Sequence, residues 1–129
     1  MLRWYFVLWL ACSVAAPAQK KQPKPPEVEL LQAAAHRDAG NINIDGKVKN
    51  TGDKPIKNLA VLYDFLDSDN HVLTSVKGEV EESVVAPGEE VEFHAQVKEP
   101  PRATSFQVNF EDGGGKYLRP AKIEVLPIE

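Results

Sequence analysis

The sequence has few of the side chains on which thiol chemistry and phosphate binding depend. It contains one cysteine in 129 residues, and 15 Lys and Arg stand against 19 Asp and Glu, giving a net charge of −4. A lone cysteine allows no intramolecular disulfide. The excess of acidic residues argues against a protein that binds nucleic acid through phosphate contacts. A chain of this length provides one small domain, so a multi-domain enzyme is not expected.

The first 18 residues have the pattern of a secretory signal peptide. Arg3 precedes an apolar stretch over residues 4–16, and Ala16-Pro17-Ala18 supplies the small residues typical of a cleavage site. The apolar run is shorter than the roughly 20 residues that a membrane-spanning helix needs. The sequence therefore predicts export, to the periplasm or outside the cell.

Cys12 leaves a second interpretation of this leader open. It follows Trp9-Leu10-Ala11, and a cysteine after a small residue in an apolar leader is a possible lipid-attachment site. Ala11 fits a bacterial lipobox, whereas Trp9 stands where a leucine is usual. Membrane anchoring through Cys12 is therefore the less favoured alternative to cleavage after Ala18, which would leave a mature chain without any thiol.

A short linker is expected between the leader and the folded domain. Residues 19–26 read Gln-Lys-Lys-Gln-Pro-Lys-Pro-Pro, in which three prolines oppose both helix and sheet. The remaining residues, 27–129, contain 11 basic and 19 acidic side chains and carry a net charge of −8.

Apolar side chains recur at every second position along this domain, which is the pattern of half-buried strands. Ile42, Ile44, Gly46 and Val48 alternate with polar residues, and clusters of Gly, Pro, Asn and Asp separate the apolar runs. The first run also contains alanines and leucines that would suit a helical turn. We predict an all-β, immunoglobulin-like antiparallel β-sandwich of about seven strands, near residues 28–35, 42–48, 59–65, 72–80, 91–97, 106–110 and 123–125.

The order of several short motifs resembles that of the FxLYD domain. The motifs are residues 46–52 (Gly-Lys-Val-Lys-Asn-Thr-Gly), 58–61 (Asn-Leu-Ala-Val), 67–73 (Asp-Ser-Asp-Asn-His-Val-Leu) and 87–89 (Pro-Gly-Glu). The Phe-x-Leu-Tyr-Asp signature would fall on residues 63–67, where Asp67 is identical. The resemblance implies an immunoglobulin-type sandwich in an exported bacterial or archaeal protein, and it brings no catalytic residues.

The strongest metal-binding pattern lies between the third and fourth predicted strands. Asp64, Asp67, Asp69 and Asn70 offer oxygen ligands of the kind that calcium prefers. The glycine and the bidentate glutamate of a calcium loop are missing, so an ordinary Asx-rich turn is the simpler interpretation.

Other residues give little sign of chemistry. The three histidines, His36, His71 and His94, lie on different predicted elements without the short spacing of metal ligands. No serine occupies a nucleophile-elbow motif. We therefore expect neither a catalytic site nor a cofactor.

Partner contacts are expected near the glycine-rich loop. Gly113-Gly114-Gly115 impose little backbone preference, so this loop is expected to be a plain turn or a mobile hairpin tip. Tyr117 and Arg119, which follow it, are of types enriched at interfaces. The resulting hypothesis is a non-catalytic exported module with an interaction or structural role in the cell envelope, its partner an unidentified protein or envelope component. The alternative is a small exported metal- or ligand-binding protein that uses the Asp67 to Asn70 turn.

Overall fold

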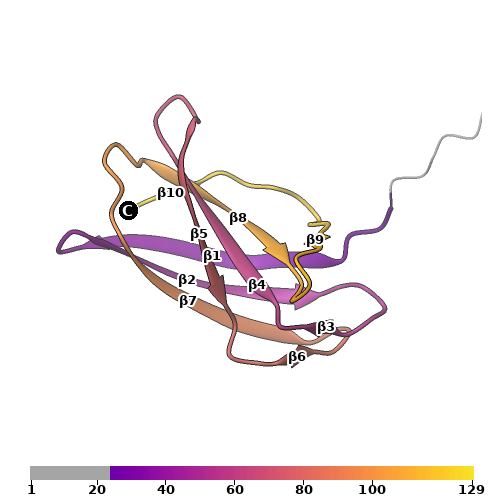
Figure 1. Ribbon diagram of the computed structural model, residues 1–129. Helices are drawn as coiled ribbons and strands as arrows, with labels where there is room; N and C mark the ends of the chain where they lie inside the picture. The colour runs from indigo at the N-terminus through magenta and orange to yellow at the C-terminus, as the bar shows by residue number, and fades with distance from the viewer. Residues whose placement is uncertain (1–23) are drawn as a thin grey trace, which may run out of the picture.

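The computed structural model describes residues 24–129, and the described chain consists of strands and loops (Figure 1). The expected signal peptide, Cys12 and most of the linker lie outside the described residues. Within the described part, no helix has the length and apolar character to cross a bilayer. The strands are β1 (Val28–Asp38), β2 (Asn41–Asn50), β3 (Ile56–Lys57), β4 (Ala60–Leu66), β5 (Val72–Glu79), β6 (Val84–Val85), β7 (Glu90–Lys98), β8 (Ser105–Glu111), β9 (Tyr117–Leu118) and β10 (Leu126–Pro127).

The two larger sheets form the layers of a β-sandwich. One sheet has the order β1-β2-β7, and the other has the order β10-β8-β4-β5, with β9 paired to β8. All pairs within these sheets are antiparallel. The short strands β3 and β6 pair separately at one end (Figure 1). The prediction of an all-β antiparallel sandwich is therefore confirmed.

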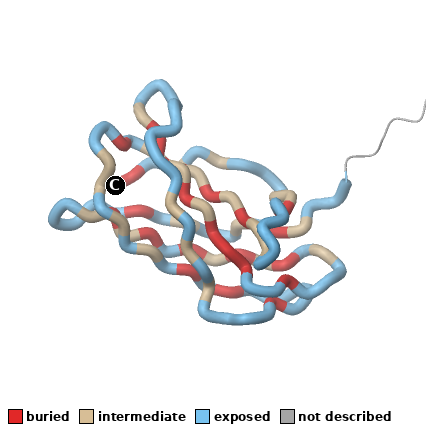
Figure 2. Tube along the Cα trace, in the orientation of Figure 1, coloured by how far each residue is buried: buried red, intermediate tan, exposed pale blue. Residues whose placement is uncertain are grey.

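The core lies between the layers, and the alternation of side chains generates it (Figure 2). Residues at alternate positions of β2 and β8 are buried, and their neighbours are half-buried or exposed. In β7, Val91 and Phe93 are buried, and Ala95 and Val97 are half-buried. The ring of Phe93 from the β1-β2-β7 sheet packs on two rings of the opposite sheet, with centroid distances of 6.1 Å to Tyr63 and 6.0 Å to Phe110. Such tilted and edge-on pairs contribute beyond the apolar area that they bury.

The first predicted strand is confirmed, and its helical alternative is wrong. β1 pairs with β2 from Val28 to Asp38, with a register irregularity between Leu30 and Gln32. Pairing along β2 outweighs the helix propensity of the alanines, because local preference is weak against tertiary contacts.

The predicted number of strands is too small, because the structure has ten. β3, β6 and β9 contain two residues each. Such short segments give no recognisable alternation in the sequence, since a period of two needs several residues to show.

The predicted strand over residues 123–125 is also wrong. Ile123 and Val125 are 55% and 48% exposed, and the last strand, β10, begins at Leu126. The chain here crosses from one layer to the other: Pro120 bridges to Val28 of β1, and Leu126 pairs with Phe106 of β8. A segment that crosses from one sheet to the other has no neighbouring strand to pair with along its length. Its alternating pattern therefore does not produce a strand.

The C-terminal segment closes this side of the sandwich. Ile128 bridges to Ala35, and the amide of Arg37 donates to the carbonyl of Glu129 at 2.8 Å. The Arg37 guanidinium also donates to the carbonyls of Ala103 and Ile128. These bonds cover the end of the outer edge of β1, and the bridge between Val28 and Pro120 covers its beginning. Both contacts reduce the edge available for pairing with other chains.

Candidate functional site

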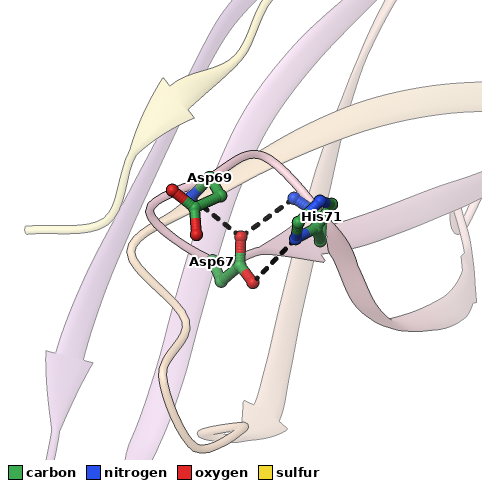
Figure 3. Close-up of side chains that lie close together, drawn as sticks. All are labelled: Asp67, Asp69 and His71. Carbon is green, nitrogen blue, oxygen red and sulfur yellow. Dashed lines mark hydrogen bonds and ion pairs between the residues drawn. The ribbon is translucent and has the colours of Figure 1, made fainter.

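The turn between β4 and β5 is built on the carboxylate of Asp67 (Figure 3). Its Oδ1 accepts hydrogen bonds from the backbone amides of Asp69 and His71, both at 2.9 Å. Asn70 takes the left-handed conformation with a φ of 62°, which asparagine tolerates better than most residues. The arrangement is an Asx-type turn, in which the side chain replaces a backbone acceptor.

This turn brings together two carboxylates and an imidazole. Ligand atoms of Asp67, Asp69 and His71 lie within 4.8 Å of one another. Asp67 Oδ2 is 3.4 Å from His71 Nδ1 (Figure 3). The backbone hydrogen bond from His71 is the largest of the contributions that lower the pKa of Asp67. Asp67 is therefore ionised at neutral pH and held in position.

The structure does not bring together the four candidate oxygen ligands that the sequence offered. Asp64 lies apart from this cluster: its Oδ1 accepts from Ser75 at 2.6 Å, and its Oδ2 accepts from Gln107 and Asn109 on β8. Asp64 lies on β4, and these hydrogen bonds direct its carboxylate toward β5 and β8 rather than toward the turn. The spacing Asp67-x-Asp69-x-His71 is the signal that could have identified His71 as the third ligand.

The other two histidines lie apart from this turn and carry their own acidic partners. His36 Nδ1 is 4.0 Å from Glu129 Oε2, and His94 Nδ1 is 2.6 Å from Asp45 Oδ1. His94 stands on the solvent side of β7, as its position in the polar phase of the strand predicts.

We expect the Asp45–His94 pair to produce a measurable pH dependence. The hydrogen bond to Asp45 is the largest cause of the raised pKa of His94, and the charges of Asp45, Glu92 and Glu81 act in the same direction. A raised folded-state pKa means that the pair stabilises the fold below the usual histidine pKa and that this stability is lost as pH rises through the raised value. An NMR titration should show that Asp45→Asn lowers the His94 pKa, whereas Asp64→Asn leaves it unchanged. Equal His94 pKa values in all three proteins would contradict this assignment.

The two residues expected to contact a partner lie at another end of the sandwich, and only one of them is free. Tyr117 is 49% exposed. Arg119 is half-buried: its Nη1 lies 3.2 Å from Glu27 Oε1, and its Nε donates to the carbonyl of Pro25 at 3.3 Å. Arg119 therefore fastens the chain before β1 to the rest of the domain, which the sequence did not reveal. The end of the expected linker is in contact with the domain as well.

Glu27 is the acceptor at the centre of these contacts. Burial raises its pKa, but the backbone amide of Arg119 and the charges of Arg119 and Lys116 together outweigh that effect and lower it. Lys116 Nζ lies 3.5 Å from Glu27 Oε2. The glutamate is thus held ionised between two cations.

The glycine-rich loop between β8 and β9 is a turn held by hydrogen bonds. Asp112 Oδ1 accepts from the amides of Gly114 and Lys116, and Gly115 has a φ of 83° that favours glycine. The amide of Gly113 donates to the carbonyl of Lys57 at 2.8 Å, which ties the loop to β3. The loop therefore forms a turn between β8 and β9 that is hydrogen-bonded to β3.

Asn50 fixes the neighbouring turn that follows β2. It is the one buried polar residue of the described chain, at 2% exposure. Its Nδ2 donates to the carbonyls of Lys54 and Val85, and its Oδ1 accepts from the amide of Gly52. These hydrogen bonds satisfy the buried amide and connect the turn to β6.

These three segments line a cavity at one end of the sandwich. The cavity has a volume of about 820 Å³ and lies between residues 25–27, 50–58 and 112–119. Figure 1 shows that the N-terminal approach to β1, strand β3 and strand β9 gather at this end of the sandwich. We call this feature the end cavity. Its volume falls within the range of small-molecule sites.

Comparison with known proteins supports the fold alone. The sequence matches no protein-family model and no curated protein. Among solved structures, a β-glucuronidase from Bacteroides uniformis superposes with a TM-score of 0.55 at 14% identity, over 80% of this chain and 14% of that one. A β-glucuronidase from glycoside hydrolase family 2 gives a TM-score of 0.52 at 12% identity, over 79% of this chain and 13% of that one.

This chain therefore spans about a seventh of the length of those enzymes. At such identities the likeness concerns the fold, and fold similarity does not carry activity from one protein to another. The class that the fold defines is that of small antiparallel β-sandwich domains.

Proposed function

We propose that this protein is a non-catalytic, exported β-sandwich module that binds another molecule in the cell envelope. Support for export comes from the leader over residues 1–18. We further propose an immunoglobulin-like topology of the FxLYD type. The orders β1-β2-β7 and β10-β8-β4-β5 correspond to A-B-E and G-F-C-C′ of immunoglobulin sandwiches.

The observation that carries this proposal is the end cavity. It combines segments that are far apart in the sequence, and its walls are held by the buried Asn50 and by Asp112. Loops supported by a rigid sandwich are where β-proteins commonly place their binding residues. A preformed site also loses less conformational entropy when a ligand binds.

Photo-crosslinking in cells tests this function. A benzoylphenylalanine at position 117 would replace an exposed aromatic residue whose chain neighbours, Lys116 and Leu118, line the cavity. The same residue at Lys98 would lie at the far end of β7. We expect a discrete crosslinked product from position 117 and none from position 98. Equal products from both positions, or none from position 117, would refute binding through this end.

Metal binding is a second candidate function, favoured by the cluster of Asp67, Asp69 and His71. An imidazole beside two carboxylates suits zinc or another transition metal better than calcium, which prefers oxygen ligands alone.

Calorimetry with zinc chloride and calcium chloride distinguishes the cluster of Asp67, Asp69 and His71 from an oxygen-only set that includes Asp64. If the cluster binds metal, zinc should bind more tightly than calcium, and His71→Ala should weaken zinc binding about tenfold or more. Asp64→Asn should leave zinc affinity unchanged, because Asp64 bonds to Ser75 and β8 instead. Absence of heat with either metal would remove this candidate, and a dependence on Asp64 would show that the oxygen set assembles in solution.

A further inference from the structure

The end cavity has a charge opposite to that of the domain around it. Residues 27–129 carry a net charge of −8, yet four of their 11 basic side chains line the cavity against three of their 19 acidic ones. The basic residues are Lys54, Lys57, Lys116 and Arg119, and the acidic ones are Glu27, Asp53 and Asp112. A locally positive concave site in an acidic protein favours an anionic ligand.

Internal pairing already engages two of the three acids. Glu27 lies between Lys116 and Arg119, and Asp112 accepts two backbone amides of its own turn. Asp53 is the remaining lining carboxylate. The same ion pairs offset the charges of Lys116 and Arg119, so the positive field of the cavity depends on Lys54 and Lys57.

Lys54 and Lys57 differ from Lys116 and Arg119, which form ion pairs with Glu27. Both are exposed, and neither lies within ion-pair distance of a carboxylate among residues 24–129. They flank Pro55 and Ile56 on the wall formed by β3 and the turn before it. These two ammonium groups are the cations that a ligand could engage without breaking an existing ion pair.

The rest of the lining combines the polar residues Asn50, Thr51 and Asn58 with an apolar part. Pro25, Pro26 and Pro55 line the cavity together with the nearly buried Ile56 and Leu118. The Asn50 side chain fixes the carbonyl of Lys54, and the amide of Gly113 bonds that of Lys57, so both lysines project from ordered backbone. Such a site offers contact to a hydrophobic body as well as charge to a head group.

We propose that the end cavity binds a small organic anion, in which a carboxylate or phosphate group is attached to an apolar or ring-shaped body. Lys54 and Lys57 would contact the anionic group, and the prolines would contact the body. This inference rests on the proposed function, because it names the ligand class for the same cavity.

Protein-observed NMR of the full domain tests the proposal with defined probes. Phenyl phosphate and benzoate carry the expected anion, and benzyl alcohol and benzylamine present the same ring without it. We expect saturable amide shifts within residues 50–58 and 112–119 for the two anions, and none for the neutral and cationic probes. The shifts should weaken as salt concentration rises, because exposed charges are screened.

Matched lysine variants locate the contact. Lys54→Gln/Lys57→Gln should weaken anion binding roughly five- to tenfold, since two partly exposed ion pairs are lost. Lys98→Gln removes an exposed lysine at the other end of β7 and should leave binding unchanged. Because all three lysines are exposed, these variants should keep the wild-type melting temperature.

The outcomes separate this inference from the proposed function. Equal shifts with benzylamine, no saturable shifts with either anion, or wild-type affinity in the double lysine variant would overturn the anion site. If position 117 still crosslinks under those circumstances, the interaction role survives and only the ligand class is wrong. Loss of crosslinking from position 117 would instead refute the proposed function itself.

Discussion

Phe93→Ala should destabilise the domain by about 3–5 kcal/mol, the range for removing a buried aromatic side chain. Phe93 is 2% exposed and is the ring of the β1-β2-β7 sheet that packs on both Tyr63 and Phe110. Its removal would leave a void between the layers that neighbouring rings on a fixed sheet fill only in part. Urea unfolding followed by circular dichroism measures the effect.

Two further variants calibrate this result. Phe93→Leu keeps most of the apolar volume and should cost clearly less than the alanine variant. Val97→Ala, on the same strand but only partly buried, should cost less still. A loss below about 1 kcal/mol for Phe93→Ala would show that Phe93 does not join the two sheets, because surface substitutions have effects of that size.

Gly46→Ala should destabilise the domain by about 1–3 kcal/mol or more, the cost of overpacking a filled core. Gly46 lies in the centre of β2 and pairs with Phe93 across the β2–β7 ladder. An added Cβ would lie 2.6 Å from Phe93 Cε2 and 2.8 Å from the carbonyl oxygen of Gln32. The ring could shift, but the backbone of β1 could not without breaking its own pairing. Thermal and urea unfolding provide the measurement.

Gly78→Ala is the matched control, because it makes the same change in β5. A Cβ added at Gly78 would lie 3.3 Å from Tyr63 Cε2, its nearest neighbour, and a small movement of the tyrosine ring would relieve this contact. Alanine also restricts the unfolded chain to a similar extent at both sites, so the difference between the two variants reports the collision. Equal effects at Gly46 and Gly78 would contradict the packing of Phe93 over Gly46.

The candidate sites were harder to predict from the sequence than the strands were. Asp64 and Asp67 are three residues apart, yet one bonds across the sheet to Gln107 and Asn109 and the other organises a turn. Arg119 resembles a free contact residue in the sequence, whereas the fold pairs it with Glu27, which lies 92 positions away. Partners this distant leave no local pattern.

The sequence by itself determined the all-β class, the positions of the six long strands and the buried faces of β2, β7 and β8. These features follow from side chains that alternate along a single strand, which is local information. Only the tertiary structure decided that residues 123–125 cross between layers, that Asp64 bonds to Gln107 and Asn109 instead of joining Asp67, and that the end cavity forms. Each of these depends on which distant segments the two sheets bring together, and the order of residues along the chain does not encode that proximity in any short pattern.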